Sequence, residues 1–445
     1  MTQMCGIGPF VTIPLMITAL GGPQAAFGWI VGAALALVDG LVWAELGAAM
    51  PGAGGTYLYL REAFQYRTGR LMPFLFVWTA MFTIPLIMAT GVIGLVQYLG
   101  FLFPGMSWVE IHAISLAIVG IVVFALYRRV SKVGAISTVL WVVALLSLLI
   151  VIVASLTHFH ASMAFNYPHN AFAFGGPFWA GLGAGLLIGI YDYLGYNTTA
   201  YMAAELKDPG RVLPRSIIYS VIGMMVAYLT MNIGVLGAVP WQTAAHSQSV
   251  ASLVLTRTWG KAAADITTVL IVVTAFGSIF AGLLGGSRMP YNAARDGLFF
   301  RHFGRLHPRH HFPHVALLVM AVITAIGSFF TLATVINVLL AVFVIVQAIA
   351  QVVALTVLRR RQATLSRPYR QWLYPVPSLL ALAGWIYVYT SSGHTAIVFS
   401  LVVLAAGLIS FFAWAKVECQ WPFGPKCIHE DFLEVPERAR QRVVA

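Results

Sequence analysis

Charged residues are scarce in this chain. Asp, Glu, Lys and Arg together make up 9% of its 445 residues, whereas soluble domains carry roughly 25%, so the composition excludes an ordinary water-soluble globular protein. Cysteine is scarce as well, since three residues are too few for a disulfide framework, and nothing indicates a secreted domain. An intrinsically disordered chain is also excluded, because 60% of the residues are apolar and disorder needs low hydrophobicity.

Lys and Arg are absent from three long stretches, residues 1–60, 71–127 and 133–206. The mean hydropathy of the whole chain is +0.86. A helix needs about 20 apolar residues to cross a membrane, so each stretch has room for two spans and a short connection. The sequence therefore predicts an all-helical integral membrane protein that crosses the bilayer many times.

Apolar runs between turn and charge signals predict about twelve transmembrane helices. They cover Met4–Leu20, Phe27–Met50, Leu71–Phe103, Ile111–Tyr127, Val133–Leu156, Pro177–Glu205, Leu213–Val239, Ala262–Gly286, Val315–Phe330, Thr334–Leu358, Tyr374–Tyr389 and Thr395–Ala415.

The basic residues orient these spans. If the first span runs outward, 24 of the 26 Lys and Arg residues lie in inner loops or in the carboxyl-terminal tail, and only Arg257 and Lys261 lie outside. Inner loops of membrane proteins carry an excess of Lys and Arg. The net charge of +12 therefore reflects topology and contact with lipid headgroups rather than nucleic-acid binding, and the carboxyl terminus is expected in the cytoplasm.

Two of the spans contain residues that weaken a helix. The first begins with Gly6-Ile7-Gly8-Pro9-Phe10, and the sixth carries two glycines, a carboxylate and an asparagine within Gly189–Asn197. Irregular backbone inside a bilayer is tolerated only where it is buried in protein or lines a cavity. Broken helices at corresponding positions of two halves indicate an inverted-repeat transporter with its site near the midplane. The predicted units are residues 1–156 (helices 1 to 5, the first apparently shortened), 177–358 (helices 6 to 10), 374–415 (helices 11 and 12) and the tail at 416–445.

Sequence motifs occur in four segments. They are Gly6–Phe10, Glu45–Tyr59 with the pattern E-L-x-x-x-x-P-x-x-G-G-x-Y, Ala204–Arg215 and Arg288–Gly297. In this order, over nearly 300 residues, they resemble the motifs of the amino acid-polyamine-organocation superfamily. The resemblance implies a secondary transporter that works by alternating access, with helices 1 and 6 forming the substrate site.

The same resemblance places the substrate at the two helix breaks. An unwound segment leaves free N–H groups at one half-helix end and free C=O groups at the other, which suits the carboxylate and the ammonium group of an amino acid. Glycine lets a ligand approach the backbone closely. The expected substrate-binding residues are Gly6, Ile7, Gly8, Pro9, Asp192, Tyr193, Gly195, Tyr196 and Asn197.

Asp192 departs from the superfamily, which usually carries a small residue or asparagine at this point. An ion at bilayer depth costs about 2.5 to 3.5 kcal/mol and is functional by default. Three roles stay open for Asp192: pairing with the side-chain amine of a cationic amino acid or polyamine, carrying a coupling proton, or bonding to freed backbone N–H groups. Tyr193 and Tyr196 either cover the substrate at an outer gate or pack in the core, and Asn197 either contacts the ligand or holds the break together.

The coupling ion is left open by the sequence, with H⁺ and Na⁺ as the candidates. Trp141 stands where some proton-linked relatives carry a lysine. Ser278, with Thr274 one turn earlier, offers hydroxyl groups of the kind that sodium-linked relatives use. Symport and exchange are both compatible with these residues. The coupling and gating candidates are Asp39, Glu45, Glu205, Ser278, Arg295 and Asp296.

Five of these candidates have further expectations attached. Glu45 is expected to pair with an Arg of an inner loop, while Asp39 either forms an ion pair or contributes to a proton route. Glu205, Arg295 and Asp296 are expected in an inner gate, whose pairs form when the cavity is closed to the cytoplasm.

We therefore expect a secondary active transporter of amino acids in the cytoplasmic (inner) membrane, with no enzymatic activity, organic cofactor or metal. Its partners would be the small-molecule substrate and the lipid bilayer. Cationic amino acids or polyamines are the alternative substrates, and a transport-inactive substrate sensor or scaffold on the same fold is the alternative of another class. The first span reaches its glycines after five residues, so we also expect the chain to be an amino-terminally shortened version of a longer reading frame.

Overall fold

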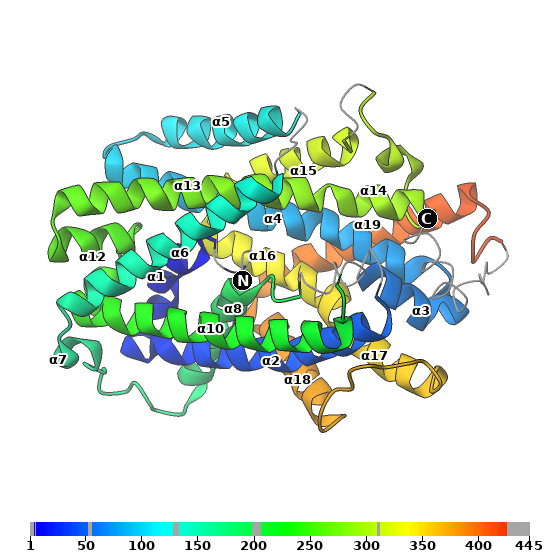
Figure 1. Cartoon of the computed structure of the whole chain (residues 1–445), viewed down its shortest axis with the longest axis horizontal. Coiled ribbons are helices and arrows are strands. Elements are labelled where there is room, and N and C mark those ends of the chain that lie inside the picture. Colours follow the sequence, from blue (N-terminus) through cyan, green and yellow to red (C-terminus); the bar gives the residue numbers. More distant parts are fainter. Residues whose placement is uncertain are drawn as a thin grey trace.

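The structure is a computed structural model of the chain, and it describes residues 4, 6–51, 56–127, 133–197, 206–308 and 312–424. Every regular element in these residues is a helix, and no strand occurs among them. Long helices run along the longest axis of the molecule (Figure 1), among them α2 (Ala26–Ala49), α4 (Leu71–Leu102), α10 (Pro209–Ala238) and α13 (Lys261–Gly286). The predicted all-helical class is confirmed for this part of the chain.

Eight segments of the described chain are long and apolar enough to cross a membrane. They are Pro23–Ala49, Leu71–Leu102, Trp108–Leu126, Thr138–Thr157, Pro209–Ala238, Lys261–Arg295, Leu332–Arg361 and His394–Val417. Three further apolar helices, α1 (Gly8–Leu20), α15 (His314–Gly327) and α18 (Val376–Ser391), have 13, 14 and 16 residues, which is short of the about 20 that a perpendicular span needs. The chain is a multi-pass membrane protein, and the count of twelve spans stays a prediction.

Each expected span overlaps at least one helix of the described chain. Besides the helices already given, those that overlap an expected span are α5 (Trp108–Leu126), α6 (Val133–Thr157), α8 (Gly176–Tyr193), α16 (Leu332–Phe343), the π-helical turn η4 (Val344–Ala348), α17 (Ile349–Arg361) and α19 (His394–Val417). Shorter elements that an apolar-run criterion does not detect lie between them. They are α3 (Thr56–Thr68), α7 (Ala161–Ala164), α11 (Trp241–Ala245), α12 (Val250–Thr258), α14 (Arg288–Arg295), η1 (Pro23–Ala25) and η3 (Arg301–Gly304).

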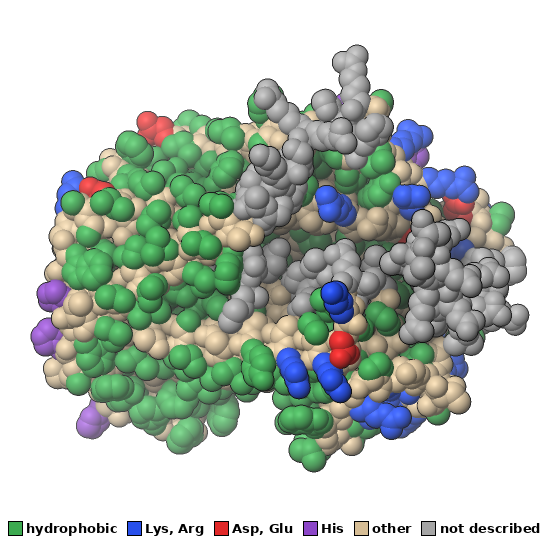
Figure 2. Space-filling view, viewed as in Figure 1, with side chains coloured by type: hydrophobic (Ala, Val, Ile, Leu, Met, Phe, Trp, Pro, Cys, Tyr) green, Lys and Arg blue, Asp and Glu red, His purple; other side chains and the backbone are tan. Residues whose placement is uncertain are grey.

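The surface agrees with a membrane environment. Hydrophobic side chains cover much of the face shown in Figure 2, while most of the Lys and Arg side chains visible there gather toward the end that holds α3, α14 and α17. This is the asymmetry that the charge count predicts. That this end faces the cytoplasm stays a prediction.

The first expected span is helical only from Gly8 onward. The residues described before it, Met4, Gly6 and Ile7, are not helical. Pro9 occupies the first turn of α1, where a missing N–H group costs nothing because the first N–H groups of a helix have no partner inside it. The glycines therefore lead into the start of α1 rather than interrupting it.

The break in the sixth span begins later than predicted. α8 runs without interruption to Tyr193, and Leu194 then adopts an extended conformation. Gly195 follows with φ of +107°, a left-handed conformation that favours glycine. Asp192 thus lies in the last turn of a helix and not in unwound backbone, which corrects the expected break at Gly189–Asn197. Glu205 lies outside the described residues.

Glycines bring α2 and α8 into direct backbone contact. A Cβ atom on Gly32 of α2 would lie 2.8 Å from the carbonyl carbon of Gly189 in α8, and one on Gly189 would lie 2.4 Å from the carbonyl oxygen of Gly28. Small residues at such spacing let membrane helices approach closely. This contact fixes the end of α8 against α2.

Helices of the two predicted repeats pack in corresponding pairs. α1 packs against α8, α2 against α10 and α4 against α13, which are the first, second and third spans of each predicted half. This pairing brings the beginning of α1 to the end of α8, where the candidate site lies, and the inverted repeat stays a prediction.

Candidate substrate site

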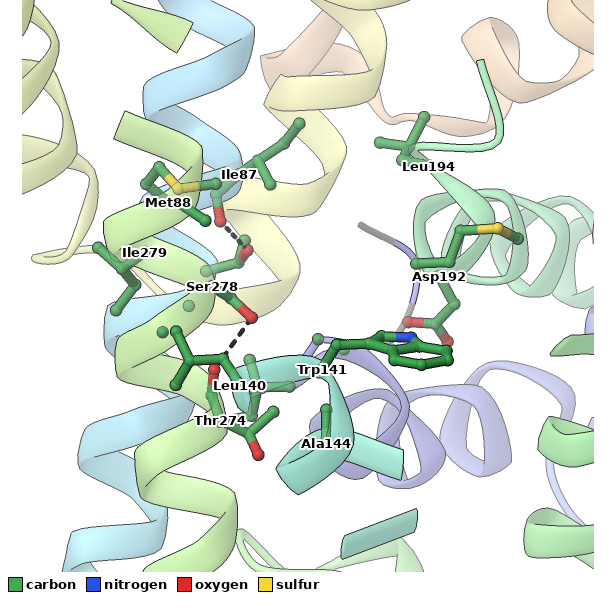
Figure 3. Close-up of a pocket in the computed structure, with 18 of the residues that line it drawn as sticks. Ile87, Met88, Leu140, Trp141, Ala144, Asp192, Leu194, Thr274, Ser278 and Ile279 are labelled. Carbon is green, nitrogen blue, oxygen red and sulfur yellow. Dashed lines mark hydrogen bonds between the residues drawn. The ribbon is translucent and has the colours of Figure 1, made fainter. Parts of the chain in front are cut away.

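A cavity of about 480 Å³ lies where α1 begins and α8 ends, with walls from α4, α6 and α13. Figure 3 shows Trp141 of α6 reaching toward Asp192 of α8, with Thr274 and Ser278 of α13 on the opposite side. The lining side chains with polar atoms are those of Thr90, Trp141, Tyr191, Asp192, Thr274 and Ser278. The aliphatic and thioether side chains come from Met4, Ile7, Ile87, Met88, Leu140, Ala144, Leu194, Ile279 and Ala281.

The cavity includes part of the expected site. Of the nine expected substrate-binding residues, Gly6, Ile7, Gly8 and Asp192 line it, as does the coupling candidate Ser278. Five expected residues do not line it in this conformation, namely Pro9, Tyr193, Gly195, Tyr196 and Asn197. The two helix ends thus meet at the cavity, and of the described turn after α8 only Leu194 lines it.

Asp192 is buried, with 3% of its surface exposed, and its two oxygens have different surroundings. Oδ2 accepts hydrogen bonds from Thr12 Oγ1 at 2.6 Å and from Trp29 Nε1 at 3.1 Å. Oδ1 has no hydrogen-bond partner among the described residues, and a Cβ atom on Gly8 would lie 2.7 Å from it. The partners of Asp192 are therefore side chains of α1 and α2 rather than freed backbone N–H groups.

A second buried polar atom in the cavity lining is unpaired in the described chain, the Nε1 of Trp141. The hydroxyl groups around it are engaged: Tyr191 and Thr90 share a hydrogen bond of 2.6 Å, and Ser278 Oγ donates to the carbonyl oxygen of Thr274 at 3.0 Å. Buried polar groups are almost always hydrogen-bonded. Among the lining side chains, the buried atoms without a partner in the described chain are thus one acceptor, Asp192 Oδ1, and one donor, Trp141 Nε1.

The amino-acid sequence matches a known family over nearly its whole length. Residues 1–417 match the family described as amino acid permease. The chain belongs to the amino acid permease family. This membership confirms the resemblance to the amino acid-polyamine-organocation superfamily, and it makes the chain a permease rather than an enzyme.

Similar proteins are transporters in bacteria and mammals. The branched-chain amino acid permease BcaP of Bacillus subtilis (strain 168) is 24% identical, with 93% of this chain and 91% of that protein covered. The protein of the same name from Lactococcus lactis is also 24% identical, with 92% of each chain covered. The Asc-type amino acid transporter 1 of Mus musculus is 28% identical, with 91% of this chain and 76% of that protein covered.

In the permease, the aromatic residues after the cavity lie in the core. Tyr193 is buried, and its ring centroid lies 5.7 Å from that of Tyr228. Tyr196 is also buried, and its hydroxyl group donates a hydrogen bond to Asp39. Both tyrosines thus pack in the core, which is one of the two roles considered from the sequence. Their role as an outer gate stays a prediction. Asn197 is buried but does not line the cavity.

Among the described residues, Asp39 accepts hydrogen bonds from neutral donors and has no cationic partner. Besides Tyr196, the indole nitrogens of Trp43 and Trp385 donate to its carboxylate at 3.0 Å and 2.9 Å. These donors come from α2, α18 and the turn after α8. The ion pair considered for Asp39 is therefore not the arrangement in this structure, where the carboxylate ties three parts of the permease together.

Glu45 forms the ion pair that the sequence predicts. Its side chain is fully buried, and it accepts hydrogen bonds from Arg359 through both the Nε atom, at 2.8 Å, and the Nη2 atom. Arg367 lies 3.6 Å away, and the backbone N–H of Gln371 donates at 2.7 Å. Burial lowers the pKa of Arg367, an effect that the charge of Glu45 opposes.

The inner candidates Arg295 and Asp296 make contacts of their own. Asp296 accepts a hydrogen bond of 2.9 Å from the hydroxyl of Tyr57 in α3, and Arg295 stacks on Tyr291 with 5.9 Å between its guanidinium carbon and the ring centroid. Burial, followed by the charge of Asp296, raises the pKa of Tyr57, which keeps its hydroxyl protonated as the donor. Asp296 thus contacts α3, Arg295 contacts Tyr291 within α14, and the Glu45 pair includes neither of them.

Thr12, Trp29, Thr90 and Tyr191 form hydrogen bonds at or beside the cavity and are absent from the sequence-based selection. Thr12 carries a signal that reading by residue type would detect, since its hydroxyl group lies one turn after Gly8 in a mostly apolar span. Trp29 has no such signal, because its approach to Asp192 depends on how α2 packs against α8.

Proposed function

We propose that the permease is a secondary active transporter that moves neutral amino acids with apolar side chains across the cytoplasmic membrane by alternating access. The proposal rests on one observation, namely that the start of α1 and the end of α8 meet at a cavity with a buried carboxylate on one side and an aliphatic wall on the other. The N-terminal end of a helix carries partial positive charge and its C-terminal end partial negative charge. Half-helix ends at the midplane suit an amino acid zwitterion.

The two charged groups of the substrate can then be assigned. Its carboxylate would lie at the beginning of α1, near the backbone of Gly6 and Gly8, where the first N–H groups of the helix have no partner inside the helix. Its ammonium group would lie at Asp192, whose Oδ1 is unpaired. Its side chain would contact the aliphatic wall, which includes Ile87 and Ile279.

The names of the relatives point the same way. Two are branched-chain amino acid permeases, and a human protein that is 27% identical over 93% of this chain is named large neutral amino acids transporter small subunit 2. An aliphatic wall favours leucine, isoleucine or valine by burying their side chains, at about 25 cal/mol for each Å² removed from water.

A specific observation favours a second substrate class. Asp192 places an acceptor in the cavity, and none of the described residues that line it is a cation. A side-chain amine would pair with Asp192 as well as an α-ammonium group does. Cationic amino acids or polyamines are therefore the alternative substrates. A transport-inactive sensor on the same fold is the alternative of another class.

Uptake into proteoliposomes tests all three. The purified full chain is reconstituted, and radiolabelled L-leucine, L-alanine, L-arginine and putrescine are offered with and without an imposed H⁺ or Na⁺ gradient. Gradient-driven accumulation of leucine above alanine and arginine is the expected result, and the gradient that drives it identifies the coupling ion. Preference for arginine or putrescine would move the assignment to cationic substrates. Binding of leucine without flux would establish the sensor.

A matched pair of glycine variants tests whether leucine binds at this cavity. A Cβ atom on Gly120 would meet no heavy atom within 4 Å, whereas one on Gly8 would meet Asp192. Gly8→Ala should abolish leucine uptake while Gly120→Ala leaves it unchanged. Equal uptake by both variants would place the substrate elsewhere.

A further inference from the structure

Thr12 Oγ1 lies within hydrogen-bond distance of two acceptors. It is 3.0 Å from the carbonyl oxygen of Gly8 and 2.6 Å from Asp192 Oδ2. A threonine hydroxyl has one hydrogen and therefore donates one hydrogen bond at a time. Both short contacts can be hydrogen bonds only if one of the partners supplies a hydrogen of its own. A carbonyl oxygen has none, so the second hydrogen has to come from Asp192.

The neutral carboxylic acid satisfies this count. Its Oδ2–H donates to Thr12, and the Thr12 hydroxyl donates to Gly8, four residues earlier in α1, as threonine hydroxyls in helices often do. The indole N–H of Trp29 still donates to the free lone pair of Oδ2. In the ionised form Thr12 turns to Asp192, and one lone pair of the Gly8 carbonyl oxygen is released.

The surroundings of Asp192 agree with a neutral group in the empty site. Its Oδ1 is buried without a partner in the described chain, and an unpaired buried charge costs far more than an unpaired buried carbonyl oxygen. The helices packed against α8, which are α1, α2, α16 and α18, supply no Lys, Arg or His within the bilayer-spanning parts that face it. The other titratable groups on these helices and on α8 itself are Asp39, Glu45, Tyr191, Tyr193, Tyr387 and Tyr389.

None of these groups offers Asp192 a positive charge. Tyr191 is bonded to Thr90, and Tyr193 packs on Tyr228. Asp39 is held by its own three donors, and a carboxylate opposes rather than favours ionisation of a second one.

We propose that Asp192, Thr12 and the Gly8 carbonyl form a proton switch in which a proton on Asp192 and the ammonium group of the substrate compete for the same site. With the proton in place, the Gly8 oxygen is occupied by Thr12 and Asp192 is neutral. When an ammonium group binds, the proton leaves to water, Asp192 becomes a carboxylate, Thr12 turns to it, and the Gly8 oxygen is free to accept from the ammonium group. One positive charge replaces another. This inference rests on the proposed amino acid site.

The switch predicts a measurable proton release. Isothermal titration of the purified full chain with L-leucine in two buffers of different ionisation enthalpy should show release of about one proton for each leucine bound, and the affinity should fall as the pH is lowered. Asp192→Asn, whose amide donates to Thr12 as the neutral acid does, should release no proton and bind leucine about tenfold or more weakly at all pH values, because a charge-assisted hydrogen bond is lost. Thr12→Ser should behave as the wild type. Thr12→Val should show a smaller pH dependence.

Infrared difference spectroscopy tests the protonation without relying on binding. Wild-type permease minus Asp192→Asn should show the carbonyl stretch of a buried carboxylic acid, and leucine should remove this band from the wild type. Size-exclusion profiles of the variants establish that they are folded. Absence of the acid band from the ligand-free protein would overturn the switch, as would leucine binding with no proton release. If the band is present but no amino acid of the panel binds, the proposed function fails while the protonated Asp192 stands.

Discussion

Asp192 Oδ2 and Thr12 Oγ1 lie 2.6 Å apart although 180 residues separate them in the chain. The contact joins the last turn of α8 to the first turns of α1, which are the two helix ends that enclose the cavity. A relative movement of α1 and α8 must therefore stretch or break this bond. The distance between Thr12 Oγ1 and Asp192 Oδ2 therefore changes whenever these two helix ends move apart.

Removing the Thr12 hydroxyl should weaken both the fold and transport. In Thr12→Val, Asp192 keeps only Trp29 as a partner, and the loss of a hydrogen bond to a buried group costs about 1–3 kcal/mol. We expect a lower melting temperature in detergent and slower leucine uptake, with Thr12→Ser close to the wild type in both. Equal melting temperatures and equal uptake rates for Thr12→Val and Thr12→Ser would show that the hydrogen bond of Thr12 contributes nothing to stability or transport.

The two glycines at the start of α1 should differ in their tolerance of a methyl group. A Cβ atom on Gly8 would lie 2.7 Å from Asp192 Oδ1, while one on Gly6 would lie 3.3 Å from Ser278 Oγ, a flexible side chain that can give way. Overpacking costs about 1–3 kcal/mol, so Gly8→Ala should lower leucine affinity by at least about tenfold. Gly6→Ala should have the smaller effect, and the reverse order in a binding assay would contradict the geometry.

Tyr196 should stabilise the permease from outside the cavity. Tyr196→Phe removes one of the three donors to the buried Asp39, at a cost of about 1–3 kcal/mol. Thermal unfolding should shift to lower temperature, while the affinity for leucine should change little because Tyr196 does not line the cavity. Tyr167→Phe, at a tyrosine that is 39% exposed, is the matched control and should melt like the wild type. A large loss of affinity in Tyr196→Phe would instead assign this residue to the substrate site.

The sequence predicts much of the helical fold because membrane helices need long apolar runs and basic residues mark the loops between them. It also predicts part of the cavity lining, since glycines and a carboxylate at bilayer depth are costly unless they line a cavity. Gly8 and Asp192 are identified in this way. Short polar helices such as α3 and α14 escape the same criterion because they contain no apolar run.

The contacts of the site depend on packing that the sequence does not reveal. Tyr196 carries the same signal as Asp192, yet α8 stays helical to Tyr193 and the turn at Gly195 directs Tyr196 toward Asp39 of α2. Trp29 meets Asp192 because glycines allow α2 and α8 to touch. A helix that ended one residue earlier or later would turn different side chains toward the cavity.

The Glu45 pair should be the more costly of two ion pairs to break. Glu45 is fully buried and Arg359 is 21% exposed, whereas in the pair of Arg301 with Glu418 the arginine is 81% exposed. A buried carboxylate that loses its partner keeps its desolvation cost, while exposed pairs contribute little. A double-mutant cycle of Glu45→Gln and Arg359→Gln, followed by thermal unfolding, should give a coupling energy of about 1–3 kcal/mol. The matched cycle of Arg301→Gln and Glu418→Gln should give a much smaller value, and equal couplings would show that burial does not decide the strength of these pairs.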